Sequence, residues 1–353
     1  MARPKAYFIN GGAGRVICSI PAFEKLAETD DDFIIVCEGG SNLYRGHPKL
    51  DHRVYDHWHK GLFHDKLKDR DLITVEPYRI WEYFNQRCSL AQAFDIEING
   101  QGVRELPPPS IYLNKVEIAQ AMTVINEVKA RSGFDKVVVV QPFGRSAHQT
   151  GSMIVDPTSR SFAAGDIKTV IDDLKKYYGV IFMTEFPVDL GETPESALVA
   201  MPQIPDLRIW AGVMELADHF IGCDSVGQHL VRALGKTATV VTGSTFPVNV
   251  SYPGCQDFDI IDAGEGRRRY SPIRVTMEDA IDRMNDHCMD LTEKQVEQII
   301  ASAKKRLGKS TKAKIKVEDP AASTIPPVNF SQVAQALCQE KSTDANVKVI
   351  GTV

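Results

Sequence analysis

Short apolar runs that favour β-strands alternate with helical segments along most of this chain. The strongest is KVVVVQPFG at residues 136–144, a continuous β-branched run typical of a strand buried on both faces. An amphipathic helix expected at residues 115–133 precedes it and ends at Gly133. Alternating strands and helices imply mainly parallel, doubly wound sheets with right-handed crossovers. The sequence therefore predicts an α/β protein.

The alternation covers both halves of the chain and is interrupted between them. Further strands are expected at residues 5–10, 32–40, 71–78, 180–186, 219–224, 237–243 and 257–262. Residues 41–70 are polar and rich in His, and a second βα series starts at Val137. We therefore expect domains at 1–132 and 133–320, with a linker and docking helix at 321–353. Two such domains leave a cleft, the usual place for a ligand.

Composition limits where the protein acts and what it binds. The 353 residues suffice for two domains, and the net charge of −5 argues against a surface that binds nucleic acid throughout. The seven cysteines are scattered without a CxxC pair, which disfavours a disulfide framework or a zinc site. Neither a signal peptide nor a membrane span of about 18 apolar residues is evident. We expect a cytoplasmic protein, with any membrane contact peripheral.

The segment IGCDSVGQHLVRALGK (221–236) joins a strand to a helix. Asp224 and Ser225 stand where a helix N-cap is expected. The unpaired N–H groups and partial positive charge of a helix N-terminus suit a phosphate, and the carboxyl end of a strand is where α/β folds bind ligands. The residues are equally compatible with an ordinary capped turn.

A glycine-rich loop, GGAGR (11–15), follows the first expected strand and opens the first helix. Gly11, Gly12 and Gly14 allow backbone to approach a ligand closely. The spacing fits neither the dinucleotide fingerprint GxGxxG nor a P-loop, so a nucleotide-dependent dehydrogenase is poorly supported. A tight strand-to-helix turn without a ligand is the alternative.

Together these segments resemble the family 9 glycosyltransferases, the heptosyltransferases of lipopolysaccharide core assembly. GGAGRVICSIPAFEKL (11–26) is similar to the family's N-terminal motif, and VVVVQPFGRS (137–146) to its first C-terminal strand and turn. Residues 210–247, with Asp-Ser, three residues and His before a helix, resemble the signature most closely. The resemblance implies a GT-B fold, in which two Rossmann-like domains face each other across the active site.

The resemblance also implies a reaction and a set of site residues. A sugar would pass from a nucleotide-diphospho-sugar to a hydroxyl, with inversion and without metal or cofactor. The acceptor would be a saccharide of the lipopolysaccharide type or another polyanion, such as modified DNA. Residues 205–207 would contact the nucleoside. The donor-binding residues would be Gly144, Arg145, Ser146, Arg160, Glu185, Asp224, Ser225, Val226, Gly227 and His229.

The first loop departs from the family pattern. Arg15 stands where the family has its general base, an Asp, and arginine cannot accept a proton at neutral pH. Candidate replacements are Asp56 and His57, in the His-rich stretch 50–66, and Glu76, at the end of the third strand. That stretch could also form an acceptor-side loop, a metal tract or a plain polar surface. A catalytically inactive nucleotide-sugar-binding or assembly protein is the alternative function.

Two basic runs remain, GRRRY (266–270) and KKRLGKSTKAKIK (304–316). A run of like charges is most often a solvated face. Contact with a polyanionic acceptor, nucleic acid or an anionic membrane through 304–316 is the second interpretation. The sequence leaves the oligomeric state open.

Overall fold

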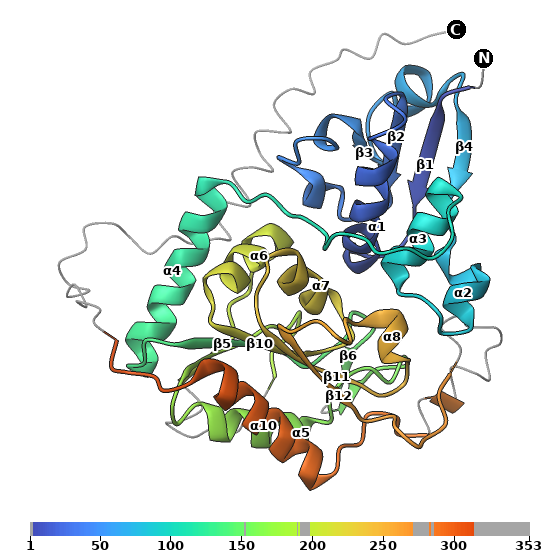
Figure 1. Cartoon of the computed structure of the whole chain (residues 1–353). Helices are drawn as coiled ribbons and strands as arrows, with labels where there is room; N and C mark the ends of the chain where they lie inside the picture. The colour runs from blue at the N-terminus through green and yellow to red at the C-terminus, as the bar shows by residue number, and fades with distance from the viewer. Residues whose placement is uncertain are drawn as a thin grey trace, which may run out of the picture. The chain divides into compact units, whose positions relative to one another are not determined.

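The structure is a computed structural model that describes residues 3–313, except 152, 189, 191–197, 271–281 and 284–285. The described residues belong to one compact unit, Met1–Lys314, which contains two parallel sheets (Figure 1). The predicted linker and docking helix at 321–353, and the end of the basic run at 314–316, lie outside the described residues. Among the helices that the structure describes, none is long and apolar enough to cross a bilayer.

The first sheet has four parallel strands in the order β3-β2-β1-β4. The strands are β1 (Lys5–Ile9), β2 (Phe33–Cys37), β3 (Val54–Asp56) and β4 (Asp71–Thr74). Helices α1 (Ala13–Leu26) and α3 (Leu90–Asn99) pack together over one face, where Tyr7 and Phe33 are buried. The opposite face is covered by Leu62 and Leu67, from the π-helical segment η3 (Leu62–Leu67). This half therefore has a helix layer on one side only.

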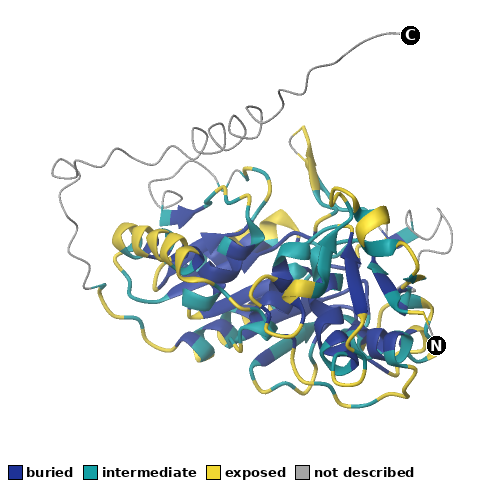
Figure 2. Ribbon diagram, turned by 90° about the horizontal axis from the view of Figure 1, so that it is seen from above, coloured by how far each residue is buried: buried dark blue, intermediate teal, exposed yellow. Residues whose placement is uncertain are grey.

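The second sheet has six parallel strands in the order β12-β11-β10-β5-β8-β9. They are β5 (Val137–Gln141), β8 (Gly179–Phe182), β9 (Val199–Ala200), β10 (His219–Cys223), β11 (Ala238–Thr242) and β12 (Phe258–Asp262). Side chains alternate between its faces: Val137 and Val139 join one core, and Val138 and Val140 the other. Strands β5, β8, β10 and β11 are buried along their whole length, and buried residues are drawn dark blue in Figure 2.

Helices cover both faces of this second sheet, as a doubly wound fold requires. The helices α4 (Lys115–Ser132), α6 (Leu207–Leu216) and α7 (Val226–Ala233) share the core of Val137, and α5 (Ala164–Leu174) and α10 (Glu293–Leu307) that of Val138. Shorter elements are η1 (Ser41–Tyr44), η2 (Asp51–Arg53), η4 (Pro77–Arg79), α2 (Trp81–Phe84), α8 (Pro247–Val250) and the hairpin β6 (His148–Thr150)–β7 (Met153–Val155). All eight predicted strands are present, and the α/β prediction is confirmed.

Helix α4 joins the second sheet, although the predicted first domain, 1–132, includes it. Its ends are as the sequence suggests, with a capping box at Asn114 and Gly133 at a φ of 75°. A methyl group added to Gly212 of α6 would lie 2.9 Å from Cβ of Ala121, and one added to Gly179 would lie 2.8 Å from Val128. This close packing places α4 over the second sheet.

Candidate functional site

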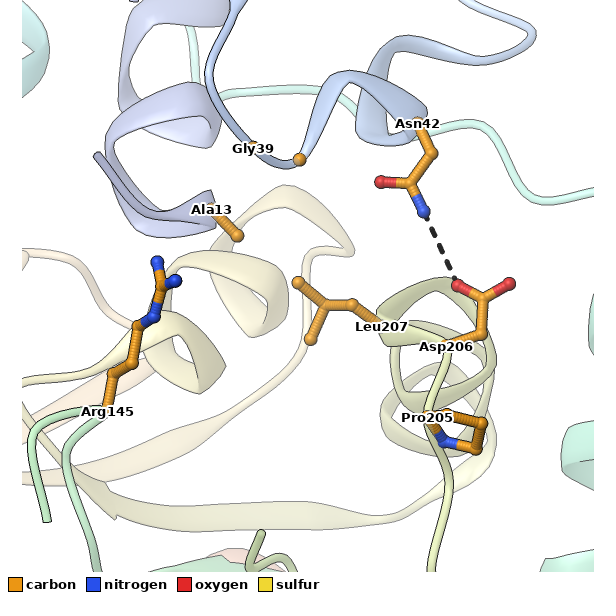
Figure 3. A pocket seen from close by; sticks show the side chains of 8 residues that line it. Ala13, Gly39, Asn42, Arg145, Pro205, Asp206 and Leu207 are labelled. Carbon is orange, nitrogen blue, oxygen red and sulfur yellow. Dashed lines mark hydrogen bonds between the residues drawn. The ribbon is translucent and has the colours of Figure 1, made fainter. Parts of the chain in front are cut away.

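A pocket of about 410 Å³ lies where strands of both sheets have their carboxyl ends (Figure 3). The first sheet contributes the residues just after β1 and β2, and the second sheet contributes residues after β5 and β9. The lining residues are Ala13, Gly39, Gly40, Asn42, Arg145, Pro205, Asp206 and Leu207. This is the position at which open α/β sheets bind ligands. The predicted turn 205–207 and Arg145 are therefore brought together.

The glycine loop forms the wall of the first sheet beside this pocket. Gly12 is the N-cap of α1 and carries no side-chain cap, so this helix starts without a side-chain partner for its N–H groups. Gly11 has a φ of 87°, which favours glycine. A methyl group on Gly12 would lie 2.8 Å from Nη1 of Arg145. The glycines thus allow a cation from the other sheet to lie directly against the loop.

Arg145 is exposed and extends toward Ala13 at the start of α1 (Figure 3). Within the described residues it has no hydrogen bond or ion pair. Its neighbours are fixed: the N–H of Gly144 donates to Oγ of Ser161 at 3.0 Å, while Ser146 is half-buried. A free guanidinium in a pocket beside uncapped helix N–H groups favours an anion.

Arg160, by contrast, is tied into a network. Its Nη1 donates to the carbonyl of Asp224 at 3.2 Å and lies 3.8 Å from a carboxylate oxygen of the same residue. Burial alone would lower the pKa of Arg160, but the Asp224 carboxylate raises it above its ordinary value. Asp156 organises the loop by accepting bonds from the backbone N–H groups of Arg160 and Ser161. Arg160 is therefore a fixed cation close to Gly144.

The junction before α7 differs from the predicted cap. Ser225 is the N-cap residue, but neither its side chain nor that of Asp224 caps the helix. Oε1 of Gln141 accepts instead from the N–H of Gly227 at 2.9 Å, and Gln141 Nε2 donates to Oγ of Ser225. A methyl group on Gly227 would lie 2.2 Å from that Oε1, so only glycine fits. Val226, where the resemblance implies Gly, is half-buried.

Asp224 faces its own protein rather than an open site. Its carboxylate accepts from Thr245 at 3.2 Å and from Gln228 at 3.1 Å, in addition to its contact with Arg160. Burial raises the pKa of Asp224, and Arg160 opposes that rise only in part. Asp224 is therefore buried among groups of the protein and holds Arg160 in place.

His229 lies in the contact between α7 and α1. Its Nδ1 is 2.8 Å from the hydroxyl of Tyr252 and 3.5 Å from Sγ of Cys18. Cδ2 of the ring would lie 3.2 Å from a methyl group on Gly14, so that glycine also permits a close approach. Burial and Arg160 lower the pKa of His229 to about 4. The imidazole is therefore neutral at pH 7.

Arg15 turns away from the pocket, into the wall beside β4. Its Nη2 donates to the carbonyl of Val75 at 3.1 Å, and the guanidinium lies over the ring of Tyr78, 4.8 Å from its centroid. Phe94 provides a second ring at 5.9 Å. The Arg15 guanidinium is thus engaged in a cation–π contact.

Two other carboxylates meet the glycine loop from neighbouring strands. Oε2 of Glu38, directly after β2, accepts from the N–H of Gly11 at 2.6 Å. Oε1 of Glu76, after β4, accepts from Nδ2 of Asn10 at 2.8 Å. Glu38 was missed by the sequence interpretation; its place at a strand end, just before Gly39, is the signal that could have found it.

The remaining predicted residues, Asp56, His57 and Glu185, are not part of the pocket lining. Asp56 ends β3, accepts from Ser41 at 3.3 Å and lies 3.6 Å from the His57 ring. Among the described residues, no three His, Cys, Asp or Glu side chains are grouped to hold a metal. Glu185 is exposed and outside the pocket lining.

The described parts of the basic runs are partly neutralised. Two cations of α10 form ion pairs: Lys304 pairs with Asp173, and Arg306 pairs with Asp259. Arg269 pairs with Asp262 in the other run. These pairs use part of the charge that a polyanion would need.

Solved structures of glycosyltransferases are similar to this chain. A family 9 glycosyl transferase from Veillonella parvula DSM 2008 has 13% identity, covers 86% of this chain and 97% of its own, and superposes with a TM-score of 0.57. E. coli ADP-heptose lps heptosyltransferase II has 11% identity, coverage of 81% and 98%, and a TM-score of 0.53. The iron-containing dodecameric glycosyltransferase TibC from enterotoxigenic E. coli H10407 has 14% identity, coverage of 86% and 79%, and a TM-score of 0.51.

No protein-family model and no curated protein sequence matches the chain. At 11–14% identity the structural likeness concerns the fold. The chain has the GT-B fold, like the family 9 glycosyltransferases that it resembles in structure.

Proposed function

We propose that this protein is a glycosyltransferase that moves a sugar from a nucleotide-diphospho-sugar to a hydroxyl. The observation that carries the proposal is the pocket at the strand ends of both sheets, with the free guanidinium of Arg145 in its wall. A diphosphate needs cations and N–H donors, and the pocket offers both beside Gly12. The similar structures include E. coli ADP-heptose lps heptosyltransferase II.

In the proposed complex, Arg145 binds the diphosphate and residues 205–207 contact the nucleoside. Arg160 adds a fixed positive charge, held by Asp224, near the turn at Gly144. As the bond to the sugar breaks, negative charge grows on the leaving diphosphate and these cations stabilise it. This would let the reaction proceed without a metal, with inversion, through an oxocarbenium-like state.

The acceptor is proposed to enter from the side of the first sheet, past the ends of β2 and β3. A saccharide of the lipopolysaccharide type or another polyanion suits the proposal. Exposed Trp58 and the histidines around it lie beyond the end of β3. A cytoplasmic location is part of the proposal.

Donor turnover tests the proposal. The wild type is incubated with ADP-, GDP-, UDP- and CDP-sugars, and the released nucleoside diphosphate is measured by a coupled assay. We expect release from one nucleotide class, and Arg145→Ala should lower kcat/KM for it by about 10- to 100-fold, the loss expected for a charged diphosphate contact. Arg131→Ala removes an exposed arginine at the end of α4 and is the matched control. Turnover of no donor would contradict the proposal.

A second candidate is a nucleotide-sugar-binding protein without catalysis. One observation favours it: Arg15, which the resemblance places at the position of the family base, is held against Val75 and Tyr78. Binding of a nucleotide sugar by calorimetry, with no nucleotide released under any condition, would select this alternative.

A further inference from the structure

The carboxylate of Glu38 contacts the glycine loop, close in sequence to residues that line the pocket. Glu38 directly follows β2, and the next two residues, Gly39 and Gly40, line the pocket. Its Oε2 accepts from the N–H of Gly11 at 2.6 Å, which fixes the carboxylate beside the loop. We propose that Glu38 is the general base that activates the acceptor hydroxyl. This inference rests on the proposed transferase function.

Arg15 cannot act as a base, because arginine accepts no proton at neutral pH. Its side chain points to the other side of the glycine loop. It donates to the Val75 carbonyl and lies over Tyr78, on the β4 side of the loop. A methyl group on Gly11 would lie 3.0 Å from Cδ of Arg15, so the side chain folds back beneath the loop. Glu38 approaches the same glycine from β2, on the other side of β1.

Glu76 is the competing carboxylate. It also lies at a strand end, but on β4, the neighbour of β1 away from Gly39 and Gly40. It is half-buried, and its Oε1 accepts from the side chain of Asn10. Glu38 is exposed, and within the described residues its side-chain oxygens accept one hydrogen bond, from the N–H of Gly11. A base must reach the acceptor and later release its proton to solvent, which favours Glu38.

The proposed step is balanced as follows. The free Glu38 oxygen takes the proton of the acceptor hydroxyl while that oxygen forms a bond to the anomeric carbon of the donor. The bond from this carbon to the diphosphate oxygen breaks, and the nucleoside diphosphate leaves with the electron pair, facing Arg145. Glu38 then gives its proton to water. No oxidant, reductant or metal takes part.

Glu38→Gln tests the assignment because an amide oxygen still accepts from the N–H of Gly11 but takes no proton at neutral pH. Donor hydrolysis with water as acceptor is measured on the nucleotide sugar that the wild type releases fastest. We expect kcat to fall at least 100-fold, the lower range of general base catalysis, with the donor Kd changed less than threefold. The rise of kcat with pH should disappear, and formate should partly restore turnover to Glu38→Ala.

Two controls separate the outcomes. Glu28→Gln makes the same change at an exposed carboxylate of the first half and should keep wild-type kcat. Glu76→Gln tests the competitor. The inference is overturned if Glu38→Gln keeps kcat within threefold of the wild type, or if Glu76→Gln abolishes the pH dependence instead. If the wild type binds nucleotide sugars but releases no nucleotide, the protein is not a catalyst. If it binds no nucleotide sugar, the proposed function is refuted as well.

Discussion

Two strand-to-helix junctions in this molecule have the same order of elements. They differ in which of their polar groups have hydrogen-bond partners among the described residues. The glycine loop joins β1 to α1, and residues 224–226 join β10 to α7. At the second junction the polar groups bind one another: Gln141 holds Gly227, while Asp224 holds Arg160. The first junction lies uncapped, with the free guanidinium of Arg145 against it.

The two junctions therefore differ in whether their polar groups are available to a ligand. At the second junction these groups hold other residues in place, since Asp224 is buried and accepts a hydrogen bond on each oxygen. The first junction retains groups that a ligand can use. A strong capping motif in a sequence therefore marks a junction, but the partners contributed by neighbouring strands decide whether the junction is open.

The largest effect is expected at the ion pair that anchors the pocket rim. Arg208, one residue after the lining residue Leu207, is buried and donates from Nε to Glu117 at 2.5 Å and from Nη2 at 2.8 Å. Its Nη1 also donates to the carbonyl of Asn42 at 3.0 Å, which links α6 to the first half. Glu117→Gln leaves the buried cation unpaired and should lower the free energy of unfolding by about 3–5 kcal/mol.

Urea unfolding measures that loss, and Arg45→Ala is its control. Arg45 lies 3.7 Å from the same carboxylate but is 57% exposed, so its removal should cost under about 1 kcal/mol. Equal losses for the two variants would show that the rim is not anchored by the buried pair.

A pair of glycine substitutions compares the two junctions directly. Gly227→Ala brings a methyl group to 2.2 Å from Gln141 and 2.5 Å from Phe220, inside a packed core, and should destabilise by about 1–3 kcal/mol. Gly12→Ala meets only the mobile end of Arg145 and should change stability by under about 0.5 kcal/mol. Thermal unfolding checks both. A larger loss at Gly12 would reverse the assignment of closed and open junctions.

The pH dependence of stability tests whether His229, in the helix after the Asp224 junction, is held neutral in the folded protein. Burial lowers the pKa of His229 from 6.5 to about 4, so between these values the unfolded chain binds a proton that the folded chain does not. Stability should therefore fall as pH drops from 6.5 to 5, by about 1.5 kcal/mol for this residue.

His229→Asn should remove that part of the slope in denaturant unfolding at several pH values. His219, whose pKa burial lowers to about 3, contributes with the same sign and stays in both proteins. Asp224, whose pKa is raised, acts in the opposite direction and also stays. An unchanged slope in the variant would mean that His229 is not held neutral against Cys18 and Tyr252.

Much of the fold was predictable because long apolar runs dominate it. Val137–Gln141 reads as a fully buried strand from its composition alone, and it is the centre of the second sheet. The three-residue β3 lies in a polar tract and is too short to show a period. The packing of α4 over the second sheet depends on contacts with Gly212 and Gly179, which no local pattern reveals.

The site was predictable in part because several of its residues follow strands that the sequence reveals. Arg145 and residues 205–207 follow strands, and strand ends of parallel sheets gather at one edge. Glu38 was missed because its importance depends on the strand order, which places β2 beside β1. The closed state of the Asp224 junction depends on Gln141, 83 residues earlier, and that partner is visible only in the folded chain.

The central claim is that the pocket beside the open junction receives the nucleoside diphosphate. Isothermal titration calorimetry of ADP, GDP, UDP and CDP with the wild type, Arg145→Ala and Arg131→Ala tests it most directly. The account predicts that one nucleotide binds the wild type, that Arg145→Ala weakens its Kd at least tenfold, and that Arg131→Ala leaves the Kd unchanged. Equal affinity in the wild type and Arg145→Ala would contradict it.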